Sequence, residues 1–194
     1  PNVNGTKLGQ LKIAIAPIEE QRAIVLKIEE LLSDLENGIH QLQTAQQQLK
    51  TYRQSLLKWA FEGKLTNINV KDGELREGWK WVKLGDNIQQ PKYGTSKKCD
   101  YSYSGKAVLR IPNISNGHID NSDLKYAVFD KKEIETYNIQ EGDLLTIRSN
   151  GSIDLVGKSA LIQKKDEDCL FAGYLIRLRP LFDKIKSKYL LYCL

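Results

Sequence analysis

The stretch of sequence that decides the fold is PIEEQRAIVLKIEELLSDLENGIHQLQTAQQQLKTYRQSLLKWAFEG, residues 17–63. Apolar residues recur in it at alternating steps of three and four, which places them along one seam of a helix. The seam is formed by Val25, Ile28, Leu32, Leu35, Ile39, Leu42, Leu49 and Leu56. This heptad pattern predicts one long helix that forms a coiled coil.

Both ends of the helix carry the expected signals. Pro17 suits the first turn, where its missing N–H costs nothing, and Gly63 suits the stop. A straight helix over this span would be roughly 65 Å long. Asn37 and Gly38 weaken it by about 1 kcal/mol, so a hairpin of two shorter helices is the alternative. The heptad phase continues across Gly38, however, and favours the single helix.

The helix needs a partner, because one helix cannot bury its own apolar seam. Gln46 and Arg53 occupy seam positions, where polar residues usually fix register and partner number at a cost in stability. We therefore expect a homodimer or a larger assembly.

The composition narrows the choice of partner and location. The 194 residues carry a formal net charge of +5, which favours a polyanion such as nucleic acid. No run of about 18 apolar residues predicts a membrane span, and residues 1–10 do not resemble a signal peptide, so we expect a cytoplasmic protein. Cys99, Cys169 and Cys193 are too scattered to predict a disulfide framework or a metal site.

Beyond the long helix, the pattern changes to short strands separated by turn residues. Strands are predicted at Trp79–Leu84, Ala107–Ile111, Asp143–Arg148, Val156–Gln163 and Leu170–Arg179, and helices at Lys131–Tyr137 and Asp183–Tyr192. The fold class is therefore α+β: a long coiled-coil-forming helix plus a mixed α/β domain rich in short strands. The predicted parts are a tail (1–16), the helix (17–63), a linker (64–78) and the strand-rich domain (79–194).

Three loops of this domain contain many of its polar and basic residues: Lys92–Lys98, Asn113–His118 and Arg148–Ser152. Ammonium groups and hydroxyls suit phosphate contact, whereas guanidinium and amide groups can pair with base edges. Ordinary solvated turns are the competing interpretation. The residues predicted to contact DNA are Lys92, Tyr93, Thr95, Ser96, Lys97, Lys98, Arg110, Asn113, Asn116, Arg148, Ser149, Asn150, Ser152 and Lys158.

The motifs of catalysis are missing from the sequence. It contains no dinucleotide-binding glycine loop, no phosphate-binding P-loop, no zinc-protease motif and no base-methylation motif. It also contains no nucleophile elbow, and its cysteines and two histidines are far apart. We therefore expect a chain without catalytic residues, without a cofactor and without a metal ion.

An ordered set of motifs resembles the specificity subunits of type I restriction-modification systems. IAPIEEQRAIV (residues 15–25) and SLLKWAFEGKL (55–65) resemble the beginning and end of their conserved helix. Gly78-Trp79 and LGD (84–86) resemble the start of a target-recognition domain, and EGDLL (141–145), VGK (156–158) and AGY (172–174) resemble its inner motifs. Nearly the whole chain is covered, and the ordered set is more specific than any one member.

The resemblance implies a subunit that selects double-stranded DNA for methyltransferase (modification) subunits and, in the full complex, for a restriction subunit. The recognition domain would read half of a bipartite target, and the helix would fix the spacing and dock the methyltransferase. Full-length family members have two such domains, so the chain resembles a half subunit or a fragment. An antiparallel dimer would bring the tail of one chain to the domain of the other. The alternative is a coiled-coil adaptor whose β-rich domain binds a protein.

Overall fold

The computed structural model describes residues 4–66, 70–71 and 73–194. The chain divides into two compact units, Pro1–Ala60 and Phe61–Leu194. Part of the predicted tail, residues 1–3, and part of the predicted linker, residues 67–69 and 72, lie outside the described residues. The boundaries of the tail and linker stay predictions.

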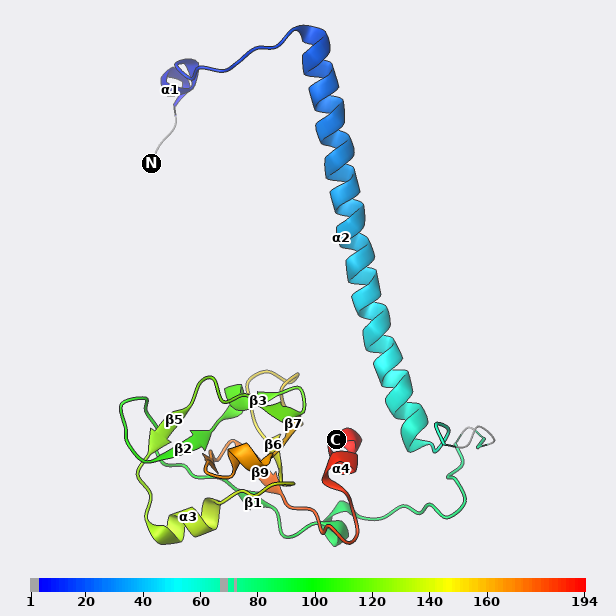
Figure 1. Cartoon of the computed structure of the whole chain (residues 1–194), viewed down its shortest axis with the longest axis vertical. Coiled ribbons are helices and arrows are strands. Elements are labelled where there is room, and N and C mark those ends of the chain that lie inside the picture. Colours follow the sequence, from blue (N-terminus) through cyan, green and yellow to red (C-terminus); the bar gives the residue numbers. More distant parts are fainter. Residues whose placement is uncertain (1–3, 67–69, 72) are drawn as a thin grey trace. The chain divides into compact units, whose positions relative to one another are not determined.

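The first unit contains a short helix, α1 (Gly5–Gly9), and the 44-residue helix α2 (Ile18–Phe61). Helix α2 continues without interruption through Gly38, where an added Cβ would meet no atom within 4 Å (Figure 1). The predicted long helix is confirmed, and the hairpin alternative is contradicted. Over the described residues, no helix carries an apolar stretch long enough to cross a membrane.

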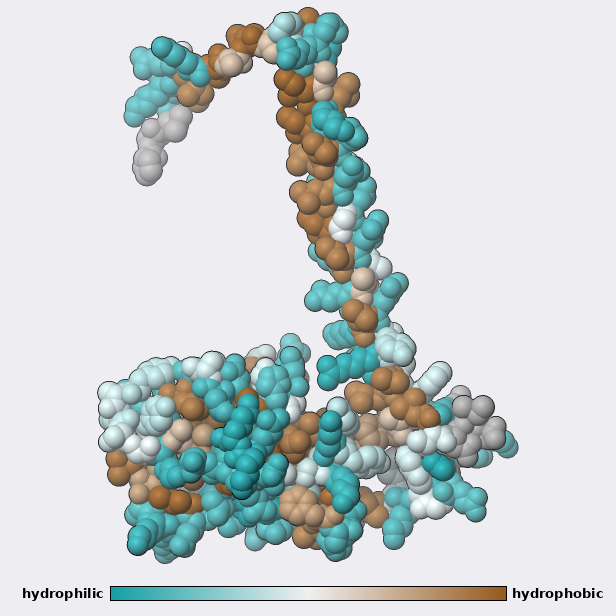
Figure 2. Space-filling model, in the orientation of Figure 1, coloured by the Kyte–Doolittle hydropathy of each residue, from teal (hydrophilic) through white to brown (hydrophobic). Residues whose placement is uncertain are grey.

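The apolar seam of α2 lies open in this chain, and no residue of the helix is buried. Exposure of the eight seam residues runs from 40% at Leu56 to 73% at Leu42. Figure 2 shows them as a brown stripe along one side of α2.

The described residues of the second unit form three small sheets. The largest has the order β1 (Lys92–Tyr93), β9 (Leu175–Leu178), β6 (Leu144–Ile147) and β7 (Ser159–Leu161). A three-stranded sheet has the order β5 (Lys125–Ala127), β2 (Lys106–Leu109) and β8 (Leu170–Phe171). Strands β3 (Ile114–Ser115) and β4 (His118–Ile119) form a hairpin. The helices are α3 (Lys131–Tyr137), α4 (Ser187–Cys193) and the 3-10 turns η1 (Leu84–Asn87), η2 (Ile111–Asn113) and η3 (Lys164–Asp166).

The core of this unit lies on both faces of β6. Leu145 and Ile147 pack in one cluster with Phe171, whereas Leu144 packs in a second cluster with Leu190 of α4. All but Leu190 are at most 1% exposed. Burial on both faces explains why β6 begins with two consecutive apolar residues, Leu144 and Leu145.

A buried ion pair supports the start of β6. Both carboxylate oxygens of Asp143 accept hydrogen bonds from Arg179 at 2.7 Å, and Oδ2 also accepts from the backbone of Gln140 at 2.9 Å. Asp143 is fully buried, so the bidentate pair and the backbone donor compensate for its lost hydration.

Several predicted elements agree with the structure and others are corrected. Helix α3 has the predicted bounds because Asp130 and Glu133 form a capping box at its start. The prediction of a strand at Trp79–Leu84 is wrong: Trp81 is 86% exposed, and none of the strands in the described residues pairs with the segment. The predicted strand at Leu170–Arg179 is two strands, separated by a turn at residues 172–174.

The remaining predicted elements are present but shorter. Strand β2 covers most of Ala107–Ile111, and β6 covers most of Asp143–Arg148. Strand β7 begins at Ser159 because Gly157 adopts a positive φ of 88° in the turn before it. Helix α4 begins at Ser187, four residues later than predicted.

Candidate nucleic-acid interface

The ends of five strands converge on one edge of the second unit. Strands β1 and β6 both pair antiparallel with β9, so both end where β9 begins. Strands β2 and β8 pair in parallel, so they end on the same side as each other. The bridge between Thr95 and Ala172 joins the loop after β1 to the turn after β8. Loops distant in the sequence therefore meet at this edge.

The meeting point is an open pocket of about 470 Å³. It is lined by Thr95, Ser96, Lys97, Lys98, Cys99, Arg110, Lys125, Arg148, Ala172, Gly173 and Tyr174. Five of these side chains are cationic, and none of the described lining residues is a carboxylate. Such a surface attracts polyanions.

Close backbone contacts hold the floor of the pocket. The backbone N–H of Thr95 donates to Phe171 at 2.9 Å, and that of Gly173 donates to Thr95 at 2.8 Å. A Cβ at Gly94 would lie 2.2 Å from the carbonyl oxygen of Phe171, so only glycine fits there. Thr95 itself is 5% exposed, and its hydroxyl accepts from the backbone of Lys97 at 3.0 Å.

Arg148 leaves the end of β6 at one wall of the pocket. Its Nε donates to the carbonyl oxygen of Gly173 at 2.8 Å, and its guanidinium carbon lies 4.7 Å from the ring centroid of Tyr93. Among the described residues, none accepts a hydrogen bond from its two terminal amino groups.

The two neighbouring lysines differ in their surroundings. Lys97 donates to Glu133 at 2.6 Å and to the carbonyl oxygen of Val128 at 2.9 Å, and it lies over the ring of Phe129. The Lys97 hydrogen bond holds the pKa of the Glu133 carboxyl below its usual value. Lys98 is exposed and, within the described part of the chain, forms no hydrogen bond or ion pair. Lys98 is therefore the freer cation.

Of the lining residues, Arg110 belongs to a hydrogen-bonded network around Asp123, which lies outside the pocket lining. This carboxylate accepts from Tyr101 at 2.6 Å and from Arg110 at 3.0 Å, and both contacts hold its pKa below the usual value. Lys125 lies 4.7 Å from the centre of the Tyr101 ring. The Cys99 thiol donates to the carbonyl oxygen of Lys97, and burial raises its pKa, which favours the unreactive neutral form.

The pocket brings together six residues that the sequence predicted to contact DNA: Thr95, Ser96, Lys97, Lys98, Arg110 and Arg148. Tyr93 lies beneath one of them, Arg148. Six others are exposed but do not line the pocket: Lys92, Asn116, Ser149, Asn150, Ser152 and Lys158.

Asn113 occupies a different position from the one expected of a DNA contact. It is 1% exposed, and its amide donates to the carbonyl oxygens of Asp120 and Asp123 at 2.9 Å. Its side-chain oxygen accepts from the backbone of Arg110 at 2.8 Å. The amide is thus fully used inside the domain, and we omit Asn113 from the site.

Sequence reasoning missed five lining residues: Cys99, Lys125, Ala172, Gly173 and Tyr174. Lys125 begins β5 and reaches the pocket only because Val108 pairs with it across the sheet. The AGY motif resembles an inner motif of the family, but the strand predicted at Leu170–Arg179 includes the turn that the motif forms. Only strand pairing places these residues at the site.

Fold and site together define an α+β protein with a long open helix and a separate strand-rich domain that bears a cationic pocket. No protein-family model matches the chain. Curated relatives do: it is 30% identical over 179 residues to the type I restriction enzyme EcoKI specificity subunit of Escherichia coli strain K12. That alignment covers 92% of this chain and 39% of the relative.

A second relative is the type I restriction enzyme StySPI specificity subunit of Salmonella potsdam. It is 28% identical over 191 residues, which are 98% of this chain and 41% of the relative. The predicted resemblance is confirmed: the chain is related to the specificity subunits of type I restriction enzymes and spans about two fifths of the length of these two relatives.

A solved structure shares the fold. It comes from work on complex assembly and conformational transition of the type I R-M system, and it matches with a TM-score of 0.56 at 21% identity. The match covers 92% of this chain and 41% of that chain. The predicted α+β fold class is confirmed.

Proposed function

We propose that the chain is a non-catalytic subunit that recognises a DNA sequence for a type I restriction-modification complex. The observation that carries the proposal is the convergence of Lys98, Lys125 and Arg148, from three separate segments, in one open pocket. Ammonium groups suit phosphates, and a guanidinium suits a base edge. The relationship to specificity subunits supports the same role.

The partners follow from the proposed role. The recognition domain reads half of a bipartite target, and α2 docks the methyltransferase subunits. In the full complex, the chain also selects that target for a restriction subunit. Co-purification of this chain with a methyltransferase subunit tests that part. An adaptor for unrelated proteins would purify without a methyltransferase subunit.

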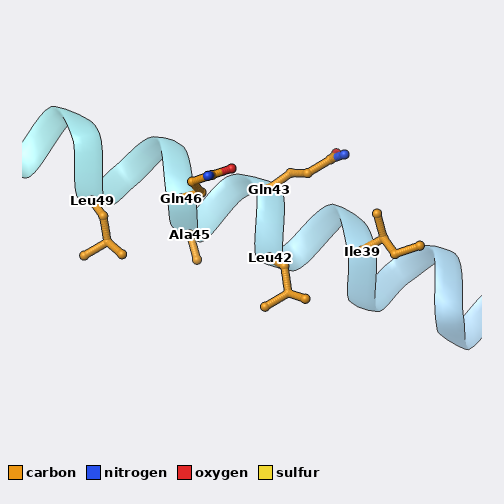
Figure 3. Close-up of a pocket in the computed structure, with 6 residues that line it drawn as sticks. All are labelled: Ile39, Leu42, Gln43, Ala45, Gln46 and Leu49. Carbon is orange, nitrogen blue, oxygen red and sulfur yellow. The ribbon is translucent and has the colours of Figure 1, made fainter. Parts of the chain in front are cut away.

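A homodimer through α2 is the second part of the proposal. The exposed seam is apolar along most of the helix, and Figure 3 shows Leu42, Ala45 and Leu49 projecting to the same side while Gln43 projects away. Pairing with a second copy of the helix would bury this seam. An antiparallel pair carries its two recognition domains at opposite ends of the rod.

A salt titration against duplex DNA tests the DNA-binding proposal. Affinity should fall steeply with added salt, because Lys and Arg release counterions when they meet phosphates. Lys98→Ala should weaken binding to every duplex and reduce the slope of log K against log salt by about 1. The control, Lys188→Ala, removes an equal charge from α4, away from the pocket, and should leave the slope unchanged. Binding that ignores salt would contradict the proposal.

A further inference from the structure

The guanidinium of Arg148 is held from two sides before any ligand arrives. The carbonyl oxygen of Gly173 accepts from Nε at 2.8 Å, and the Tyr93 ring faces the guanidinium at 4.7 Å. The backbone N–H of Arg148 also donates to the carbonyl oxygen of Tyr174 at 3.0 Å. A flexible arginine would lose side-chain entropy on binding, and this one has lost part of it already.

One holding group lies on a strand of the sheet, and the other lies in a turn that is hydrogen-bonded to the neighbouring loop. Tyr93 is the last residue of β1, whose neighbour β9 begins directly after the 172–174 turn. Gly173 is fixed by its backbone bond to Thr95 at 2.8 Å. Both groups therefore lie on a paired framework, which positions a side chain better than a free loop does.

Tyr93 has no visible role in the core. It is 59% exposed, and it belongs to none of the buried clusters. Its ring contacts the guanidinium of Arg148. An exposed aromatic residue that faces one guanidinium is explained by its effect on that guanidinium.

The contact at Nε leaves the far end of the guanidinium for a ligand. Two parallel N–H groups on the terminal nitrogens match a pair of neighbouring acceptors. In the major groove, guanine offers O6 and N7 as such a pair, whereas adenine places a donor beside N7. Phosphate is the competing acceptor, and it would carry no sequence information.

We infer that Arg148 reads one guanine of the target in the major groove and that Tyr93 is a positioning residue that fixes the reading guanidinium. This inference rests on the proposed DNA-recognition function and specifies one base of its target. The Gly173 carbonyl sets the direction of the fork, and the Tyr93 ring holds its plane.

The test is selection of bound sequences from a pool of randomised duplexes by the whole chain, followed by affinity measurements on the selected duplex. The unmodified chain should select guanine at one or more positions. Arg148→Lys keeps the charge but loses the fork, so one guanine position should become degenerate and affinity for the selected duplex should fall about 5- to 100-fold. Affinity for random duplexes should change less than about twofold.

Tyr93 is tested by a pair of variants. Tyr93→Leu should lower affinity for the selected duplex by about 3- to 10-fold and loosen the same position, whereas Tyr93→Phe keeps the ring and should retain selection. The control, Tyr192→Leu, changes an exposed tyrosine of α4 outside the pocket. Circular dichroism and thermal unfolding of each variant establish that the fold is intact.

The outcomes separate the two proposals. If the chain selects no sequence from the pool, both the proposed function and this inference are contradicted. A chain that selects a sequence but no guanine, or whose guanine preference survives Arg148→Lys, overturns the inference alone. Equal losses on selected and random duplexes would assign Arg148 to phosphate. Unchanged selection by Tyr93→Leu would remove the positioning role.

Discussion

At the scale of single residues, the charges of the pocket are unequal. Lys97 donates to Glu133 at 2.6 Å, so much of its field is cancelled before DNA approaches, whereas Lys98 has no such partner among the described residues. Arg110 is similarly paired with Asp123 at 3.0 Å. Counting cations in the sequence therefore overstates how many are free to bind phosphate.

Glu133 provides a prediction at this scale. Glu133→Gln should tighten binding to all duplexes and steepen the salt dependence, because it removes the carboxylate that neutralises Lys97. Glutamine keeps the capping-box interaction at the start of α3, so the helix should persist. The measurement is the salt-dependent affinity of the variant for duplex DNA.

The matched control for this experiment is Glu135→Gln. It makes the same change of net charge on the same helix, but Glu135 has no ion pair among the described residues. If both variants tighten binding equally, only the overall charge matters and the local account of Lys97 is wrong.

Residue types and spacing predicted much of the site, but not its pairing. Lys98 and Arg148 could be proposed from their loops because ammonium and guanidinium groups suit DNA. Asn113 belongs to a polar loop of the same kind, yet its side-chain amide is fully hydrogen-bonded to the backbone of Asp120, Asp123 and Arg110. Lys125 reached the pocket through a neighbouring strand. Such contacts depend on tertiary packing, which local patterns do not record.

At the scale of elements, α2 was the most predictable part of the chain. Its period repeats over 44 residues, so one weak residue such as Gly38 could not outweigh it. Strands were less predictable because they need a neighbour. Trp79–Leu84 has strand-forming residues but pairs with no strand in the described part of the chain, and Leu170–Arg179 is divided by the turn that reaches the pocket.

The seam of α2 gives the prediction at this scale. Leu42→Glu should break the proposed dimer, because it places a charge on the face that a second helix would cover. Thr44→Glu is the control, since a residue two positions along projects to nearly the opposite side of the helix. Sedimentation should give a dimer for the unmodified chain and for Thr44→Glu, and a monomer for Leu42→Glu. A monomeric unmodified chain at micromolar concentration would refute the dimer.

At the scale of the whole molecule, the proposed dimer is a symmetric reader. Two copies related by a two-fold axis present the same pocket twice, so the preferred target should be a palindrome with a spacer. The half-site would be set by the pocket, and the spacer by the paired rods.

Footprinting on a selected duplex tests the symmetric reader. The unmodified chain should protect two equal half-sites separated by an unprotected spacer. Leu42→Glu should protect single half-sites with lower affinity, because it loses the advantage of two linked contacts. Protection of one half-site by the unmodified dimer would contradict the symmetric arrangement.

The Gly173 carbonyl that aligns Arg148 is a main-chain atom, as are the groups that anchor the loop after β1 to the turn after β8. Replacing the solvent-facing side chains around these main-chain groups would leave the hydrogen bonds between them in place. Exchanging a few solvent-facing residues at the rim of the pocket should therefore give new DNA specificities with little loss of thermal stability.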